Sequence, residues 1–266
     1  MPFARLAACA LFLLLATPAA AQDAPAPSQC LAIAETLPQV TYASFTPAQA
    51  EAQEVTITYA GHSTYVIETP GGVRIATDYS GRYGADPLPD VVTMNKAHST
   101  HYSLNPDPRI AHVLPGWNDE NPPAAHALVV DDVYIRNVPT DIRAWSGMEV
   151  GGNSIFVFEV AGLCIGHLGH LHHPLEPEHY AAIGRLDVVM VPIDGGMTLS
   201  LPAMSEIARR LQSSIVLPMH RFSTPIAQFV AMLDERFAVE FRDSPSTKIS
   251  IRSLPRRPTV VILEGV

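Results

Sequence analysis

Seven of the eleven histidines in this 266-residue chain gather in three places, and imidazole is the side chain that most often binds metals in proteins. The segment from Met94 to Tyr102 carries His98 and His101, three residues apart. A second group of four lies between residues 167 and 173, and His220 stands alone. One His-x-x-His pair in a loop is weak evidence for a ligand set. Three such places in one chain favour a bound metal ion, which can activate water for hydrolysis.

Each of these places follows an apolar run that is typical of a buried strand. His98 and His101 come after Val91–Met94, the second group begins at the end of the run from Leu163, and His220 follows Ile215–Met219. Loops at strand ends are where folds with sheets commonly carry binding and catalytic residues. The pattern therefore predicts that the histidines lie near one edge of a sheet.

Two acidic residues, Asp78 and Asp194, also end predicted strands on that edge. A carboxylate there has two candidate roles. It can hydrogen-bond a histidine that binds metal, or it can act as a general base if no metal-activated water is present. Asp194 is therefore a candidate catalytic residue.

The rest of the pattern predicts one domain of two β layers with helices outside. Three hairpins come first, over residues 55–75 with a Gly-rich turn at 69–72, over 127–138, and over 154–167. Predicted helices at 177–184, 202–211 and 225–236 then alternate with strands at 186–193, 215–219, 248–252 and 259–263. No repeat longer than a hairpin and no internal linker divides this part of the chain.

The N-terminus has the layout of a secretory signal peptide: Arg5, an apolar run from Leu6 to Ala16, and Ala19-Ala20-Ala21 before Gln22. We expect residues 1–21 to be this signal, residues 22–53 to be an N-terminal extension, and residues 54–266 to be the domain. The expected location is outside the cytoplasm, in the periplasm. There, Cys30 and Cys164 either pair as a disulfide or remain a free and a buried thiol.

The formal net charge of −9 argues against nucleic acid as a partner, and no polybasic patch points to a membrane surface. Removal of residues 1–21 would take away Arg5 and no acidic residue, so the mature chain would be more acidic still. The expected partner is a small-molecule substrate, and the oligomeric state is not readable from the sequence.

In their order, the motifs resemble the metallo-β-lactamase superfamily, particularly its ascorbate-phosphate-lactonase-like branch. The resemblance covers residues 55–225. It rests on Ile57–Thr64, Asp78, Met94–His101, Gly151–Ser154, His167–His170 and Leu217–His220. It implies an α+β fold, a four-layer αββα sandwich, with the metal site at the edge of the two sheets.

The chain departs from the family's metal motif, His-x-His-x-Asp-His, which in this register gives Lys96, His98, Thr100 and His101. The family's bridging aspartate becomes His170, and a further histidine expected near residues 140–142 is missing. A binuclear zinc site is therefore not expected. The resemblance implies one divalent ion held by a set of four histidines: His98, His101, His170 and His220. Zinc is the first expectation, while an imidazole-rich site also suits copper, nickel or iron.

The resemblance also suggests roles for residues around this set. The Lys96 ammonium would point to the place of the family's first cation and would stabilise a substrate oxyanion, which makes Lys96 the second candidate catalytic residue. The alternative is an exposed lysine that extends into solvent. His62, His167 and His173 are expected to support the ligands, and His172 is expected to face solvent.

Two functions follow from these patterns. The first is a secreted metal-dependent hydrolase that acts on an ester, lactone, amide or phosphoester bond through metal-activated water. The second is a non-catalytic descendant of the fold that binds a metal or another ligand. Four bound histidines would close a tetrahedral site, whereas three would leave a position open for water.

Overall fold

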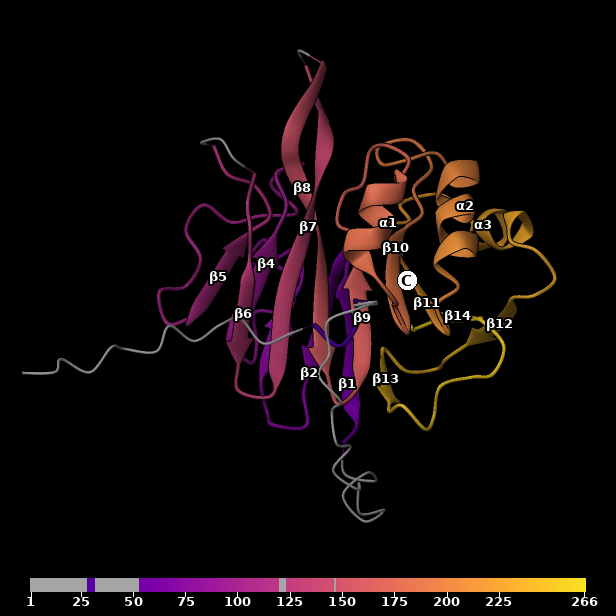
Figure 1. Cartoon of the computed structure of the whole chain (residues 1–266), viewed down its shortest axis with the longest axis horizontal. Coiled ribbons are helices and arrows are strands. Elements are labelled where there is room, and N and C mark those ends of the chain that lie inside the picture. Colours follow the sequence, from indigo (N-terminus) through magenta and orange to yellow (C-terminus); the bar gives the residue numbers. More distant parts are fainter. Residues whose placement is uncertain (1–27, 32–52, 120–122, 146) are drawn as a thin grey trace, which may run out of the picture.

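Two mixed β-sheets form the body of the protein, whose computed structural model describes residues 28–31, 53–119, 123–145 and 147–266 (Figure 1). The six-stranded sheet has the order β13 (Ser246–Ile249), β1 (Val55–Gly61), β2 (Thr64–Glu68), β3 (Arg74–Ala76), β4 (Val91–Met94) and β5 (His112–Pro115). The eight-stranded sheet has the order β12 (Ala238–Phe241), β14 (Thr259–Ile262), β11 (Ile215–Met219), β10 (Val188–Pro192), β9 (Leu163–His167), β8 (Gly147–Val160), β7 (Val133–Ala144) and β6 (Ala127–Val130).

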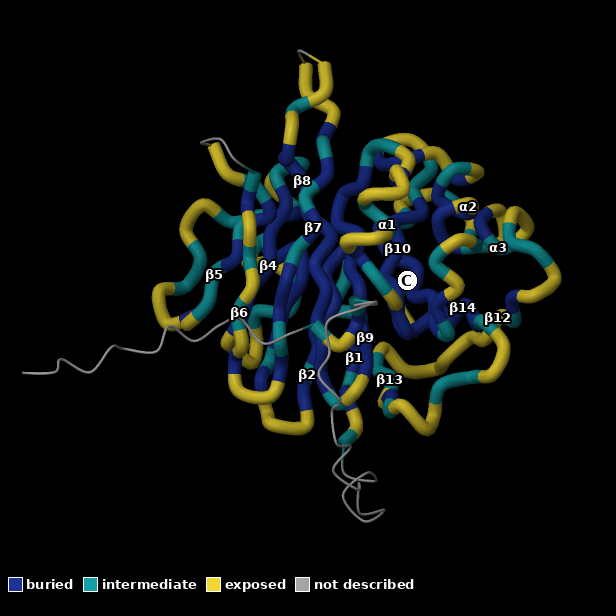
Figure 2. Tube along the Cα trace, in the orientation of Figure 1, coloured by how far each residue is buried: buried dark blue, intermediate teal, exposed yellow. Residues whose placement is uncertain are grey.

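Apolar side chains alternate between the two faces of the eight-stranded sheet, and both faces are buried. On β8, Phe156 and Phe158 join the core between the two sheets. Ile155 and Val157 point the other way, into a second core beneath the helices. Strands buried on both faces are held rigidly, which suits them to position side chains at their ends. Figure 2 shows the buried strands at the centre and the exposed residues in loops and at the hairpin tips.

All three helices in the described residues follow β9: α1 (Pro177–Ile183), α2 (Leu201–Leu211) and α3 (Ile226–Met232). They contribute to the core on the outer face of the eight-stranded sheet, and α2 buries Met204, Ile207 and Ala208 at the spacing of one helical face. The outer face of the six-stranded sheet is covered in the described residues by loop side chains such as Tyr79 and Ile110. The predicted α+β sandwich is therefore confirmed, and within the described part of the chain its fourth layer consists of loops rather than helices.

Most predicted elements are present, and the differences lie where the apolar pattern is weak. Strands β7 and β8 extend well past their predicted ends, over residues 139–144 and 147–153, and the hairpin that they form projects beyond the sheets (Figure 1). Glycine and polar residues in these stretches interrupt the apolar pattern from which strands are predicted. Strand β12 was not predicted, because three of its four residues are exposed. Helix α3 ends at Met232, short of the predicted Arg236.

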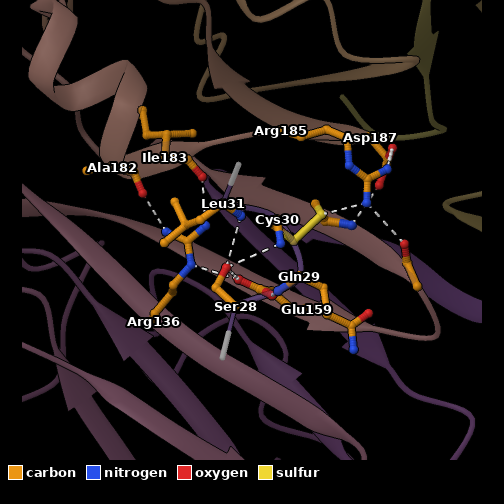
Figure 3. Close-up of a disulfide and its surroundings, with 12 residues drawn as sticks. Ser28, Gln29, Cys30, Leu31, Arg136, Glu159, Ala182, Ile183, Arg185 and Asp187 are labelled. Carbon is orange, nitrogen blue, oxygen red and sulfur yellow. Dashed lines mark hydrogen bonds and ion pairs between the residues drawn. A yellow bond between two sulfur atoms is a disulfide. The ribbon is translucent and has the colours of Figure 1, made fainter. Parts of the chain in front are cut away.

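The predicted signal peptide and nearly all of the predicted extension lie outside the described residues. Within the extension, Cys30 is bonded to Cys164 by a disulfide, which decides between the two alternatives for these cysteines (Figure 3). The Glu159 carboxylate accepts hydrogen bonds from the Ser28 hydroxyl at 2.5 Å and from the Arg136 guanidinium at 2.8 Å. Residues 28–31 are thus fixed to the eight-stranded sheet. No helix among the described residues is long and apolar enough to cross a membrane.

Candidate metal centre

The parallel strands of both sheets end at the site. Strands β9, β10 and β11 are parallel, and His170, Asp194 and His220 follow their carboxyl ends. In the other sheet, β3 and β4 are parallel, and Asp78 and the loop with His98 and His101 follow their ends. The carboxyl ends of parallel strands meet at one edge, which is why residues more than 100 positions apart in the sequence converge here.

The four histidines predicted as metal ligands do come together. His98, His101, His170 and His220 each offer a ring nitrogen, and no two of these nitrogens are more than 4.8 Å apart. The ring centroids of His101 lie 4.6 Å from those of His98 and His170, and 5.0 Å from that of His220. His101, His170 and His220 are buried, and His98 is the least buried of the four.

A buried carboxylate orients His101. The Nδ1–H of His101 donates to Asp78 Oδ2 at 2.8 Å, and Asp78 Oδ1 accepts a bond of 2.7 Å from the Asn95 side-chain amide. Burial by itself would raise the pKa of Asp78, but the neighbouring imidazoles of His101 and His167 and these hydrogen bonds hold it well below its usual range. Asp78 therefore stays ionised and keeps the proton of His101 on Nδ1.

Asp194 does the same for His220. Asp194 Oδ2 accepts bonds from His220 Nδ1–H at 2.8 Å and from the Thr198 hydroxyl at 2.5 Å, and Oδ1 accepts the backbone N–H of Gly196, Met197 and Thr198. Although burial opposes it, this set of donors holds the pKa of Asp194 well below its usual range. Both oxygens are engaged, so the geometry favours the orienting role over the general-base role.

The two oriented histidines face each other. In the neutral form of both rings the single proton is on Nδ1, so His101 Nε2 and His220 Nε2 each present a lone pair, and these two atoms are 3.2 Å apart. Two lone pairs at this distance repel unless a cation lies between them. Two zinc–nitrogen bonds of about 2.0–2.1 Å at a tetrahedral angle place their nitrogens about 3.3 Å apart. The residues present therefore fit a shared metal ion.

His170 enters the cluster in a different way. Its Nδ1 lies 2.6 Å from His172 Nε2, and its own Nε2 is buried without any hydrogen-bond partner. The expectation that His172 faces solvent is wrong, because His172 Nδ1 also accepts the backbone N–H of Arg143 at 2.5 Å. Burial and the neighbouring imidazoles lower the pKa of His170, and burial lowers that of His172 to about 4. Both rings are therefore neutral near pH 7.

Thr100 links His98 to His62. The Thr100 hydroxyl lies 2.7 Å from His98 Nδ1 and 3.0 Å from His62 Nε2. Burial, with the charges of nearby imidazoles, lowers the pKa of both histidines to about 4. The His62 ring centroid is 4.4 Å from that of His220, and its carbonyl accepts the backbone N–H of His220. His62 thus packs against the cluster, as predicted for a supporting residue.

The backbone at the site is held in uncommon conformations. His62, Asp78 and His220 have positive φ angles of 56°, 45° and 49°, which non-glycine residues adopt rarely and at a cost in energy. At Gly169, with a φ of 61°, a β-carbon would come within 2.4 Å of the amides of Asn95 and Asn153. The surrounding packing must therefore hold this geometry, and non-glycine residues with positive φ often mark functional sites.

A solvent-accessible cavity of about 370 Å³ reaches the cluster. Its lining includes three histidines, His98, His170 and His172, together with Arg143 and Met197. The volume falls within the range typical of small-molecule sites.

Known proteins share this arrangement of elements. The family model described as the beta-lactamase superfamily domain matches residues 56–220, more than half of the chain. The chain belongs to the beta-lactamase superfamily. No curated protein matches the sequence.

Solved structures agree with the superfamily assignment. A candidate Zn-dependent hydrolase of the metallo-β-lactamase superfamily from Thermotoga maritima is 28% identical, with a TM-score of 0.54 over 79% of this chain and 98% of its own. A candidate metal-dependent hydrolase from Parabacteroides distasonis shares the fold at 15% identity, with a TM-score of 0.55 over 69% of this chain and 90% of its own. The superfamily and the histidine cluster support a metal-dependent hydrolase as the class of protein.

Lys96 was expected to point its ammonium toward the place of the superfamily's first cation, but its charge is paired elsewhere. Its ammonium pairs with the carboxylates of Asp119 at 2.8 Å and Glu149 at 2.7 Å, and these bonds raise its pKa. Lys96 lines a second, adjoining cavity together with Trp145, and not the one lined by the cluster histidines. Its positive charge is therefore offset outside the cluster, contrary to the geometry expected from the resemblance.

The remaining histidines of the second group hold backbone in place. His167 Nε2–H donates to the Ser63 carbonyl at 2.9 Å, and its Nδ1 accepts the Gly169 N–H. His173 Nε2 accepts the backbone N–H of Asp141 at 3.0 Å.

Two buried asparagines, Asn95 and Asn153, were missed in the sequence analysis, although both lie inside the motifs that carry the superfamily resemblance.

Proposed function

We propose that the protein is a metal-dependent hydrolase with a single metal ion in the histidine cluster. The observation that carries the proposal is the pair of Nε2 atoms of His101 and His220, 3.2 Å apart, each with its Nδ1–H bound to a buried carboxylate. Outer carboxylates of this kind fix the tautomer of metal-binding histidines and raise their basicity. His98 is the proposed third ligand from this set.

The chain's own residues would perform the following tasks. Asp78 and Asp194 keep protons on the outer nitrogens of His101 and His220, so that their inner nitrogens can bind. The Thr100 hydroxyl fixes the His98 ring from its Nδ1 side. A divalent ion bound there polarises a carbonyl or phosphoryl oxygen and lowers the pKa of water. The cavity of about 370 Å³ admits a small substrate to that place.

The finer assignments are also proposals. Zinc is the expected ion, because three imidazoles with one open position are typical of catalytic zinc. The scissile bond would be an ester, lactone, amide or phosphoester in a small molecule, as in the ascorbate-phosphate-lactonase-like branch. Secretion to the periplasm is proposed from the signal-like N-terminus, and the Cys30–Cys164 disulfide is consistent with an oxidising compartment.

The test is metal analysis of protein exported to the periplasm. We expect about one equivalent of one metal in the wild type, and loss of that metal in His98→Ala and His101→Ala. His112→Ala, on β5 and outside the cluster, is the control and should keep the metal. Loss of esterase or phosphodiesterase activity with the metal would support catalysis. A wild-type protein that takes up no divalent metal during export or reconstitution would refute the proposal.

The second candidate function is a non-catalytic metal-binding protein. It is favoured by the loss of the superfamily's first histidine and carboxylate, which become Lys96 and Thr100. A metal held by all four histidines would be closed to water. In that case, the metal would be present, all four histidines would be required for it, and no hydrolysis would be detected with esters, lactones, amides or phosphoesters.

A further inference from the structure

We propose that His170 does not bind the metal but presents its Nε2–H to the cluster as a hydrogen-bond donor for the oxygen atom of water or substrate. The inference rests on the proposed function and refines it, because it separates one member of the histidine set from the rest. The hydrogen-bond partner of Nδ1, the nitrogen that points away from the cluster, determines whether Nε2 carries a proton or a lone pair.

A chain of two hydrogen bonds sets the tautomer of His170. The backbone N–H of Arg143 can only donate, so His172 Nδ1, at 2.5 Å, must accept. A neutral imidazole has one N–H, and that of His172 is therefore on Nε2. His172 Nε2–H then donates to His170 Nδ1 at 2.6 Å. The single proton of neutral His170 is consequently on its Nε2, the nitrogen that faces the cluster.

His101 and His220 are built in the opposite sense. Their outer nitrogens meet the carboxylates of Asp78 and Asp194, which only accept, so their inner nitrogens carry lone pairs. The cluster thus combines two inward lone pairs with one inward N–H. Lone pairs bind a cation, whereas an N–H repels a cation and binds an acceptor.

The inward N–H of His170 lacks an acceptor within the protein. His170 is 2% exposed, and its Nε2 has no hydrogen-bond partner among the described residues. A buried donor left unpaired destabilises the folded chain, and an acceptor atom from outside the chain would remove that penalty. The ring lines the cavity that reaches the cluster, so such an acceptor can enter. An oxygen atom of water, or of a carbonyl or phosphoryl group in a substrate, would accept this hydrogen bond.

The outer end of this chain of bonds is fixed. The Arg143 guanidinium donates to the carbonyls of Gly196, Met197 and Thr198 at 3.2, 2.8 and 2.7 Å, which ties the β7–β8 hairpin near its tip to the loop after β10. The Arg143 backbone N–H is thereby held against His172. His172 is a positioning residue in this arrangement, and His170 is the group that touches the reacting oxygen.

The first test measures the tautomers directly, by ¹⁵N NMR of the histidine-labelled full chain, both metal-free and loaded with Zn²⁺. We expect His170 and His172 to carry their protons on Nε2, and His101 and His220 on Nδ1. His170 should keep its Nε2–H after Zn²⁺ is added. An unprotonated Nε2 on His170 in the zinc-loaded protein would overturn the inference.

The second test compares Zn²⁺ affinity by competition with a chelating dye. His101→Ala removes a ligand and should raise Kd more than about 100-fold, whereas His170→Ala should change Kd less than about tenfold, the lower end of effects of outer groups. Equal losses in the two variants would make His170 a ligand and overturn the inference. If His170→Ala does not fold, the wild-type spectra decide the question.

A third variant reverses the outer partner. His172→Glu places an acceptor beside His170 Nδ1 and still accepts the Arg143 N–H. We expect the proton of His170 to move to Nδ1 and the Zn²⁺ affinity to rise by about 10–100-fold, because a third inward lone pair becomes available beside those of His101 and His220. An unchanged tautomer in this variant would contradict the inference. A wild type that binds no metal would refute the proposed function, while spectra of the metal-free protein would still decide the tautomer.

Discussion

Replacing Asp78 by Asn tests the role of the carboxylate behind His101. The two side chains have nearly the same shape, and asparagine tolerates the positive φ of 45° at this position. In the wild type, Asp78 Oδ2 accepts from His101 and Oδ1 accepts from Asn95, at 2.8 and 2.7 Å, in a fully buried place. An amide has only one oxygen. In either orientation, therefore, its NH₂ group faces a donor.

The expected effect has two parts. One buried donor without an acceptor costs about 1–3 kcal/mol of the free energy of unfolding. If the new NH₂ faces His101, the proton of that ring moves to Nε2 and the inward lone pair is lost. Loss of an outer partner typically weakens metal binding about 10–100-fold, which corresponds to about 1.4–2.7 kcal/mol.

Urea unfolding of the metal-free protein and competition with a chelating dye would measure these two effects. Asp132→Asn is the matched control, because Asp132 accepts two hydrogen bonds in an exposed turn, from Thr69 and Gly71. It should leave the metal affinity unchanged. A folded Asp78→Asn protein that binds Zn²⁺ within about threefold of the wild type would refute this account of the site.

Three further predictions concern stability. Gly169→Ala should lower the free energy of unfolding in urea by more than about 2 kcal/mol, because the backbone strain and the close contact with the β-carbon both destabilise the folded state. The control is Gly162→Ala, which has a φ of 76° but open space around the β-carbon and should lose only the energy of the backbone strain. Equal losses in the two variants would contradict this prediction. In the metal-free protein, His62 and His98 have a pKa of about 4, below the 6.5 of the unfolded chain, so the unfolded state binds more protons between these values. Stability should therefore fall from pH 6.5 to pH 4, by about 1 kcal/mol for each histidine after allowance for partial exposure, and a flat profile of urea midpoints would disagree. Cys30→Ser should lower the free energy of unfolding by about 2–5 kcal/mol, and a reductant should destabilise the wild type similarly but not the variant.

The elements of the fold were largely predictable from the sequence. Strands with strong apolar patterns, such as β10 and β11, lie where they were expected, because burial on both faces demands continuous apolar runs. The exposed strand β12 and the outer part of the β7–β8 hairpin were not found, since neither carries such a pattern. The disulfide was left open, because a separation of 134 residues says nothing about distance in space.

The candidate site shows the same division. The residue types and their places after strands predicted that His98, His101, His170 and His220 would converge, and the structure brings them together. The sequence also predicted that Asp78 and Asp194 would end strands at that edge. It could not say which nitrogen of each histidine points inward.

Only the tertiary structure decided the protonation pattern of the cluster. Asp78 and Asp194 accept hydrogen bonds from the Nδ1–H of His101 and His220, while the backbone N–H of Arg143 donates to His172, which in turn donates to His170. These partners come from other strands and from the main chain, and a backbone N–H at a given place leaves no mark in the sequence. The sequence by itself thus determined which side chains gather, and the hydrogen bonds of the folded chain determined what each of them offers to a metal or a substrate.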